Sequence, residues 1–300
     1  VSAIWADKSF EEVVDFASAN RFACVEMMCW PVGKAERRYA GVTHINVDEL
    51  NDAQVQHIHR YLQQKNVMIS GLGYYPNPLA ADEAKALHEI EHIKKIIRAA
   101  ARLKIPVVNT FVGRDPQRSI DDNFKVFEER FPAIIAEAEK HNIKIGIENC
   151  PMFFTGDEWP GGKNLAFSPA TWRRMFEIIP NPLFGLNYDP SHLVWMQMDE
   201  VQPLFEFKDR IHHVHLKDVK VYRDKLNEVG ILATPLEYHS PKLPGLGDVR
   251  WREFFSALTT IGYRGPTCIE VEDKAYEDSE AMVKTSILQS RNYVSQFMVL

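Results

Sequence analysis

The stretch Ile211-His-His-Val-His-Leu-Lys-Asp218 predicts a buried strand that stops in charged residues. Its apolar residues suit a sheet that is covered on both faces. Because alternate residues of a strand share a face, we expect His213, His215 and Lys217 to point in one direction. Three other strand-like runs also end in a side chain of a type that binds metal ions, namely Ile145-Gly-Ile-Glu148, Phe184-Gly-Leu-Asn-Tyr-Asp189 and Cys268-Ile-Glu270.

Strand-like and helix-like runs alternate along the whole chain. Helix starts carry capping patterns, such as Ser9 with Glu12, and Ser168 before Pro169. Strict alternation predicts a parallel sheet with right-handed crossovers, and eight strands close such a sheet into a barrel. The sequence therefore predicts an α/β fold, a single (β/α)8 TIM barrel that spans residues 1–300 as one domain. The eight predicted strands lie in or near residues 1–5, 22–27, 67–73, 106–112, 143–149, 184–189, 211–216 and 265–270.

Composition and charge narrow the class of protein. Hydrophobic residues make up 45% of the 300 residues and charged residues 25%, which is ordinary for a protein with a sizeable core. The net charge of −6 weighs against a nucleic-acid partner, because such binding relies on basic surfaces. The cysteines form no C-x-x-C pair, and we find no secretion signal and no apolar run that could span a membrane. We therefore expect a reduced, cytoplasmic protein without a membrane partner.

Three long strand-to-helix loops are predicted near residues 30–47, 150–167 and 222–247. We interpret the last of these, which is rich in proline and glycine, as a binding loop or lid and not as a second domain. Trp30 and Trp159 lie in the first two loops and could stack on a sugar ring, although packing in the core is an equal alternative.

The strand ends are where a barrel of this kind carries its reactive groups. Glu148, Asp189, His215 and Glu270 occupy this place on four consecutive predicted strands, so we expect them to converge. Three carboxylates would repel one another, and a divalent cation is the simplest compensation. Such a ligand set suits Mn²⁺ or Mg²⁺ first, with Co²⁺ or Zn²⁺ possible. The alternative is that these are strand-end charges held by lysines and arginines of the loops. Glu26 ends another strand and could anchor a loop or contact a substrate.

Five motifs resemble the xylose-isomerase-like TIM-barrel superfamily, and the resemblance runs over nearly the whole chain. This superfamily includes ketose 3-epimerases, inosose dehydratases and isomerases, and apurinic-site endonucleases. The resemblance implies one divalent metal ion held by the four residues named above. The motifs are Ile147-Glu-Asn149, Asp189-Pro-Ser-His192, His215-Leu-Lys-Asp218, Pro244-Gly-Leu-Gly-Asp248 and Ile269-Glu270.

The resemblance also implies roles for single residues. Glu148 and Glu270 would be the catalytic pair that takes a proton from the substrate and returns it through a metal-stabilised enediolate. His192 would contact a substrate hydroxyl or orient a neighbouring ligand. The epimerases use an arginine six residues after the ligand histidine to bind substrate. This chain has Val221 there, so the match fails at this position, and Lys217 or Arg223 is the candidate replacement.

The implied function is isomerisation or epimerisation of a small-molecule keto-sugar or cyclitol. A dehydratase or keto-glycoside lyase on the same scaffold is the alternative, because the ligands do not decide where the proton returns. An endonuclease is disfavoured, since the third and fourth strands end in Gly73-Tyr74 and Asn109-Thr110 where those enzymes have extra histidines. A sugar-binding subunit without activity would not need a complete ligand set. Relatives of this kind often form dimers or tetramers, so we expect a homo-oligomer.

Overall fold

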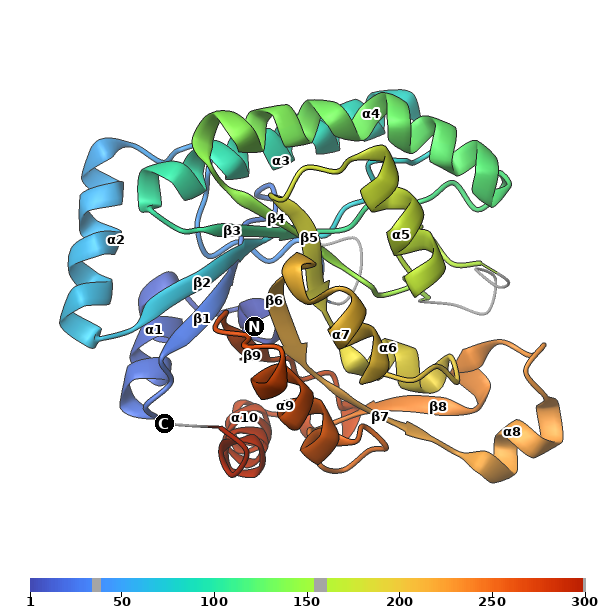
Figure 1. Ribbon diagram of the computed structural model, residues 1–300. Coiled ribbons are helices and arrows are strands. Elements are labelled where there is room, and N and C mark those ends of the chain that lie inside the picture. The colour runs from blue at the N-terminus through green and yellow to red at the C-terminus, as the bar shows by residue number, and fades with distance from the viewer. Residues whose placement is uncertain (34–38, 154–160, 299–300) are drawn as a thin grey trace.

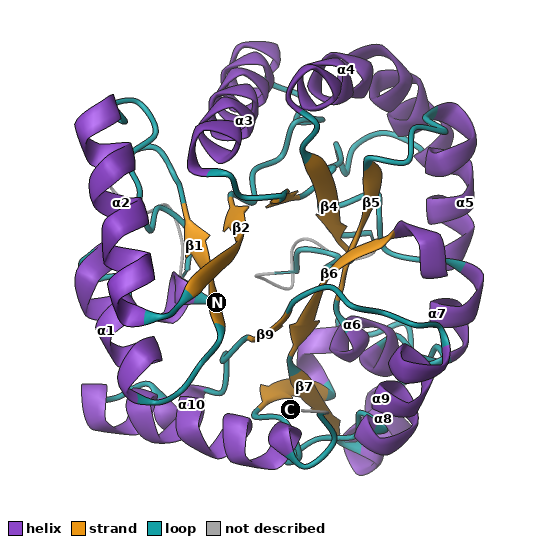
Figure 2. Cartoon of the chain, turned by 60° about the vertical axis from the view of Figure 1, so that its left-hand side comes forward, coloured by secondary structure: helices purple, strands orange, loops and turns teal. Residues whose placement is uncertain are grey.

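The computed structural model describes residues 1–33, 39–153 and 161–298. Parallel strands form its centre and helices surround them (Figures 1 and 2). The strands are hydrogen-bonded in the order β1-β2-β3-β4-β5-β6-β9, which is the predicted TIM barrel, nearly closed. Their bounds are β1 Cys24–Met28, β2 Met68–Gly73, β3 Val107–Thr110, β4 Lys144–Glu148, β5 Phe184–Tyr188, β6 Ile211–Leu216 and β9 Thr267–Ile269.

Helices cover the outside of the sheet, and their starts follow local sequence signals. Ser9 and Glu12 form the predicted capping box, and Ser168 caps the helix that opens with Pro169. The bounds are α1 Phe10–Ala19, α2 Asp52–Lys65, α3 Glu83–Leu103, α4 Ile120–His141, α5 Pro169–Ile178, α6 Pro190–Trp195, α7 Gln202–Glu206, α8 Arg223–Val229, α9 Trp251–Thr260 and α10 Glu280–Ser295.

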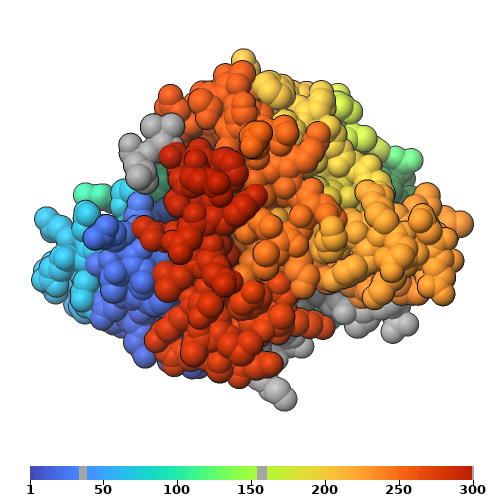
Figure 3. Space-filling model, turned by 90° about the horizontal axis from the view of Figure 1, so that it is seen from below, coloured from blue at the N-terminus to red at the C-terminus, as the bar shows by residue number. Residues whose placement is uncertain are grey.

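The first predicted strand is wrong, because residues 2–4 form a 3₁₀ helix. The backbone N–H of Trp5 bonds to the carbonyl of Ser2 at 2.9 Å, which closes a turn where a strand would be extended. The segment lies between β1 and β9, the two edge strands of the nearly closed sheet. The Val1 ammonium donates to the Ile269 carbonyl at 2.7 Å, and Ser2 Oγ accepts from the N–H of Met28 at 3.0 Å. Figure 3 shows the N-terminal part of the chain (blue) next to the C-terminal part (red).

The segment predicted as a long irregular loop near residues 222–247 contains regular elements. β7 (Asp218–Val221) pairs with β8 (His239–Lys242) in an antiparallel hairpin, and α8 lies between the two strands. The carboxylate of Asp218 organises this region. It accepts hydrogen bonds from backbone N–H groups of Val219, Gly245 and Val249 and from the indole of Trp251. These contacts join the hairpin to the start of α9.

The main hydrophobic core fills the space between the sheet and the helices. Its largest buried rings include Trp172 of α5, Phe127 and Phe131 of α4, and Phe184 of β5. At the carboxyl ends of the strands the interior is polar instead, and buried charged side chains gather there. Among the described residues, no helix has both the length and the apolar character needed to cross a bilayer.

Candidate metal centre

The structure brings the four predicted ligands together at the carboxyl end of the barrel. Glu148 is the last residue of β4, and His215 lies in β6. Asp189 directly follows β5 and caps α6, and Glu270 directly follows β9. One ligand atom from each of the four lies within 4.8 Å of the other three. Side chains that are distant in sequence thus form one compact cluster.

Two buried ligand atoms have no hydrogen-bond partner among the described residues. They are Nδ1 of His215 and Oδ2 of Asp189, and both side chains are fully buried. The nitrogen faces Glu270 Oε2 at 3.5 Å and Glu148 Oε1 at 3.8 Å. Buried polar atoms nearly always have a partner, so the Nδ1 of His215 points to a missing one. Three carboxylates and one imidazole form a donor set that fits a divalent cation.

The ammonium group of Lys217 lies among the same carboxylates. Its Nζ is 2.7 Å from Glu270 Oε2 and 3.1 Å from Asp189 Oδ2. It is also 3.2 Å from Glu272 Oε2 and 3.8 Å from Glu148 Oε1. Burial lowers the pKa of Lys217, but these carboxylates raise it well above its ordinary value, so the ammonium is charged. When His192 and His215 are neutral, one ammonium does not balance four carboxylates, and the remaining negative charge is a second reason why a cation fits.

His192 is buried beside the ligands and does not face solvent. Its Nε2 lies 3.1 Å from Asp189 Oδ2 and 3.5 Å from Glu148 Oε1. Its Nδ1 accepts a hydrogen bond of 3.3 Å from the indole of Trp195, which stacks on His239 with ring centroids 4.8 Å apart. Because an indole only donates, the proton of His192 must sit on Nε2. The imidazole therefore presents an N–H to the centre.

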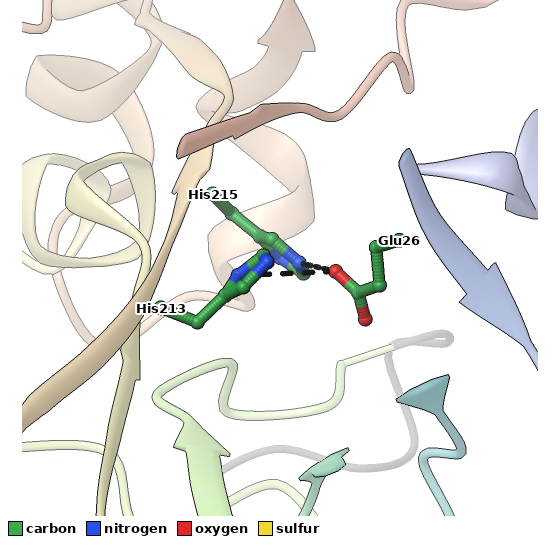
Figure 4. A group of neighbouring side chains, drawn as sticks. All are labelled: Glu26, His213 and His215. Carbon is green, nitrogen blue, oxygen red and sulfur yellow. Dashed lines mark hydrogen bonds and ion pairs between the residues drawn. The ribbon is translucent and has the colours of Figure 1, made fainter. Parts of the chain in front are cut away.

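Glu26 and Tyr75 also belong to the centre, although the sequence did not assign them to it. Glu26 Oε2 lies 2.6 Å from Nε2 of His215 (Figure 4), and the hydroxyl of Tyr75 donates to Oε1 at 2.5 Å. Burial raises the pKa of Glu26, but His215, His213 and Tyr75 together lower it to about 2, so the group is a carboxylate. The available signal was the position of Glu26 near the end of a strand, which did not reveal its partner.

Only one of the two aromatic residues predicted to contact substrate lies within the described residues. Trp30 is half-buried and packs edge-on against Tyr74, with ring centroids 4.8 Å apart, beside the hydrophobic core. Trp159 lies outside the described residues. Stacking of either ring on a substrate therefore stays a prediction.

The two residues that could replace the arginine expected at position 221 have different surroundings. Val221 is buried in β7. Arg223 starts α8 and donates to Gln197 Oε1 at 2.6 Å, away from the four ligands. Lys217, by contrast, contacts two of the ligand carboxylates, Asp189 and Glu270, and also Glu272 within 3.2 Å.

Comparison with known proteins agrees with this architecture. The sequence profile of the family described as xylose isomerase-like TIM barrel matches residues 14–293. The chain belongs to this family. The resemblance inferred from the five motifs is thereby confirmed.

Relatives by sequence include a long match and several short ones. The uncharacterized protein YfiH of Bacillus subtilis (strain 168) is 27% identical over 311 residues, which cover 96% of both chains. The inosose dehydratase of Clostridium perfringens (strain ATCC 13124) is 29% identical over 105 residues, which cover 33% of this chain and 34% of the dehydratase.

Solved structures share the fold at low sequence identity. The IolI protein with a bound zinc atom has a TM-score of 0.71 and 15% identity, and the match covers all of this chain and 98% of IolI. The D-psicose 3-epimerase with D-tagatose from Clostridium cellulolyticum H10 has a TM-score of 0.66 and 11% identity, with 98% and 96% covered. Relatives and neighbours thus include named epimerases and dehydratases, so family membership does not choose the reaction.

Proposed function

We propose that this protein is a divalent-metal-dependent isomerase or epimerase of a keto-sugar or cyclitol. The observation that carries the proposal is the unpartnered Nδ1 of His215, which faces Glu148 and Glu270. Together with Asp189, these residues would hold one divalent ion, with Mn²⁺ or Mg²⁺ first and Co²⁺ or Zn²⁺ as alternatives. The zinc atom in the IolI structure and the sugar in the epimerase structure support a metal-dependent sugar enzyme.

The chemistry follows from the two glutamates. A bound divalent ion would stabilise the negative charge of an enediolate and so make the neighbouring C–H more acidic. Glu148 and Glu270 are then placed to take that proton and to return it. Burial raises the pKa of each, but His192 lowers that of Glu148 and Lys217 lowers that of Glu270, so both start as proton acceptors. Return on the opposite face inverts the carbon and gives an epimer.

Two groups would orient the substrate. The N–H at Nε2 of His192 and the ammonium of Lys217 both face the carboxylates of the centre, so each can donate to a substrate oxygen. Trp30 and Trp159 are proposed to stack on the sugar ring from the neighbouring loops. These four contacts would hold the reacting carbon between Glu148 and Glu270.

Elimination is the alternative reaction. A dehydratase or keto-glycoside lyase must stabilise the departing oxygen, and the buried ammonium of Lys217, 2.7 Å from Glu270, can donate a hydrogen bond to it. The short match to inosose dehydratase points the same way. Both reactions begin with the same proton removal, so the fate of the intermediate separates them.

A substrate panel tests the proposal and chooses the reaction. Protein loaded with Mn²⁺ is incubated in D₂O with keto-sugars, inososes and keto-glycosides, and the products are followed by NMR and mass spectrometry. Epimerisation or isomerisation conserves the elemental composition, with deuterium incorporated at the reacting carbon when the proton exchanges with solvent, whereas elimination loses water or an aglycone. Conversion that is equal with and without metal would contradict the proposal.

Variants of the two glutamates test their roles. Glu148→Gln and Glu270→Gln should each abolish turnover while thermal unfolding shows a folded protein. Glu137→Gln is the control, because this carboxylate pairs with Arg98 and Lys140 on the outer helices. Near-normal turnover in either of the first two variants would refute the role of that residue.

A cytoplasmic homo-oligomer, dimer or tetramer, completes the proposal. The four cysteines are free thiols, which suits a reducing compartment. Light scattering after size exclusion measures the assembly directly, and a monomer at micromolar concentration would contradict that part of the proposal.

A further inference from the structure

A chain of buried hydrogen bonds supports His215 from the side opposite to the proposed metal ion. Glu26 in β1 lies 2.6 Å from Nε2 of His215 in β6, as Figure 4 shows. Tyr75, two residues after β2, donates to the other oxygen of Glu26 at 2.5 Å. All three side chains are buried. Gly73 makes room for this carboxylate, because a Cβ there would lie 2.6 Å from Glu26 Oε1.

The partners decide which nitrogen of His215 carries the proton. A carboxylate only accepts, so the 2.6 Å contact with Glu26 requires a hydrogen on Nε2. The amide nitrogen of Asn187 lies 3.0 Å from the same atom, but it also lies 3.2 Å from the hydroxyl of Tyr75, which can accept from it. Asn187 Oδ1 in turn contacts Nδ1 of His213 at 2.9 Å. These contacts fix Nε2 as the donor and leave Nδ1 without a proton in the neutral ring.

We propose that Glu26, held by Tyr75, is a positioning residue that fixes the tautomer and orientation of His215 so that Nδ1 binds the divalent ion. This inference rests on the proposed metal centre and adds a residue to it. The unpartnered Nδ1 lies 3.5 Å from Glu270 Oε2 and 3.8 Å from Glu148 Oε1, on the ligand side of the ring. A carboxylate that accepts a hydrogen bond from the far side of an imidazole also makes the ring a stronger electron-pair donor to the metal ion. Loss of such a partner costs about 10- to 100-fold in metal affinity.

A second cation site is the competing interpretation of the same residues. Glu26, His213 and His215 each offer an atom within 4.8 Å of the others. However, Nδ1 of His213 is 4.0 Å from Glu26 and already contacts Asn187, and its Nε2 contacts Ser70 Oγ at 3.1 Å. Both ring nitrogens of His213 are therefore satisfied, which leaves two ligands for a second ion.

The test measures the affinity of metal-free protein for Mn²⁺ by competition with a chelating dye. We expect one Mn²⁺ per chain in the wild type and about 10- to 100-fold weaker binding in Glu26→Gln, which keeps the shape and removes the charge. Tyr75→Phe should give a smaller loss. Glu200→Gln is the matched control, because Glu200 is an equally buried carboxylate that pairs with Arg250 away from the centre, and its Mn²⁺ affinity should equal that of the wild type.

A spectroscopic readout separates positioning from direct ligation. In zinc-loaded protein labelled with ¹⁵N-histidine, we expect zinc on Nδ1 of His215 and a strongly hydrogen-bonded proton on Nε2 that shifts upfield in Glu26→Gln. Zinc on Nε2, two ions per chain, or unchanged Mn²⁺ affinity in Glu26→Gln would each overturn the inference while the metal centre stands. A wild type that binds no metal would overturn both. If metal-free Glu26→Gln is unfolded, Tyr75→Phe decides the outcome.

Discussion

Asp189 and Asp218 are two buried carboxylates near strand ends, and they differ in what surrounds them. Asp218 begins β7, and its two oxygens accept four hydrogen bonds of 2.8–3.0 Å. Asp189 follows β5, and its Oδ1 accepts one bond from Ser191 at 2.8 Å. Its Oδ2 has ion pairs with Lys217 and His192, both at 3.1 Å, but no hydrogen bond within the described part of the chain.

The difference separates a structural acid from a proposed metal ligand. Burial raises the pKa of Asp218, and its neutral N–H donors do not fully reverse this. Burial also raises the pKa of Asp189, but the charge of Lys217 and the contact with His192 lower it well below its ordinary value. The hydrogen bonds from neighbouring N–H groups thus satisfy both oxygens of Asp218. Asp189 is kept ionised with an oxygen available for a ligand, and this contrast can be tested.

Of all the variants, Asp189→Asn should have the largest effect, and this effect is a loss of activity. The amide removes one negative ligand from the proposed centre, and a metal ion contributes several kcal/mol to such chemistry, so turnover should fall by about 10³-fold or more. Thermal unfolding of the metal-free protein should stay close to that of the wild type, because a like-sized side chain replaces one of several crowded carboxylates. Turnover within about tenfold of the wild type would remove Asp189 from the ligand set.

Lys217→Met should have the next largest effect, on stability without metal. The ammonium contacts three carboxylates within 3.2 Å, and removal of one partner from a buried ion pair costs about 3–5 kcal/mol of unfolding free energy. Saturating Mn²⁺ should recover part of this loss, because the ion then balances the same carboxylates. The loss of unfolding free energy and its recovery are both measured by urea unfolding with and without Mn²⁺.

Lys220→Met is the matched control for that variant. Lys220 pairs with Asp248 at 2.6 Å, but both side chains are at least 32% exposed, so we expect a change of about 1 kcal/mol or less, independent of Mn²⁺. Equal losses in the two variants would contradict the view that Lys217 compensates the charge of the centre.

Asp218→Asn should have a smaller effect, and on stability alone. The amide nitrogen would face N–H donors that now bond to a carboxylate, and an unsatisfied buried donor costs about 1–3 kcal/mol. Mn²⁺ affinity should not change. Asp248→Asn in the same region is the control, because Asp248 is only half-buried, and its loss should be smaller. Loss of Mn²⁺ binding in Asp218→Asn would mean that the two acids are not independent.

The sequence predicted the ligand cluster better than the groups that support it. Glu148, Asp189 and Glu270 are polar residues at the end of apolar runs, and the barrel rule places such ends together. Glu26 fits the same rule, but its partner His215 is 189 residues away, and no local pattern joins them.

Two errors in the predicted fold have a similar cause. Prolines near β8, including Pro241 within it, argue against a strand, yet the antiparallel pairing with β7 is held by the contacts of Asp218. Residues 1–5 look strand-like by composition, but their hydrogen bonds to Ile269 and Met28 hold them as a turn between β1 and β9. In both places, contacts between distant segments outweigh local preference.

Trp195→Phe should have the smallest effect, and on turnover. The indole donates to Nδ1 of His192 at 3.3 Å and so fixes the N–H of that ring toward Asp189, while phenylalanine keeps most of the packing. One hydrogen bond is worth about 1 kcal/mol, so kcat should fall about fivefold with Mn²⁺ affinity unchanged. Trp172→Phe is the control, because its indole donates to the Ala166 carbonyl at 2.8 Å in the core. It should lower stability but leave kcat unchanged, and an equal fall of kcat in both variants would show that Trp195 acts through packing alone.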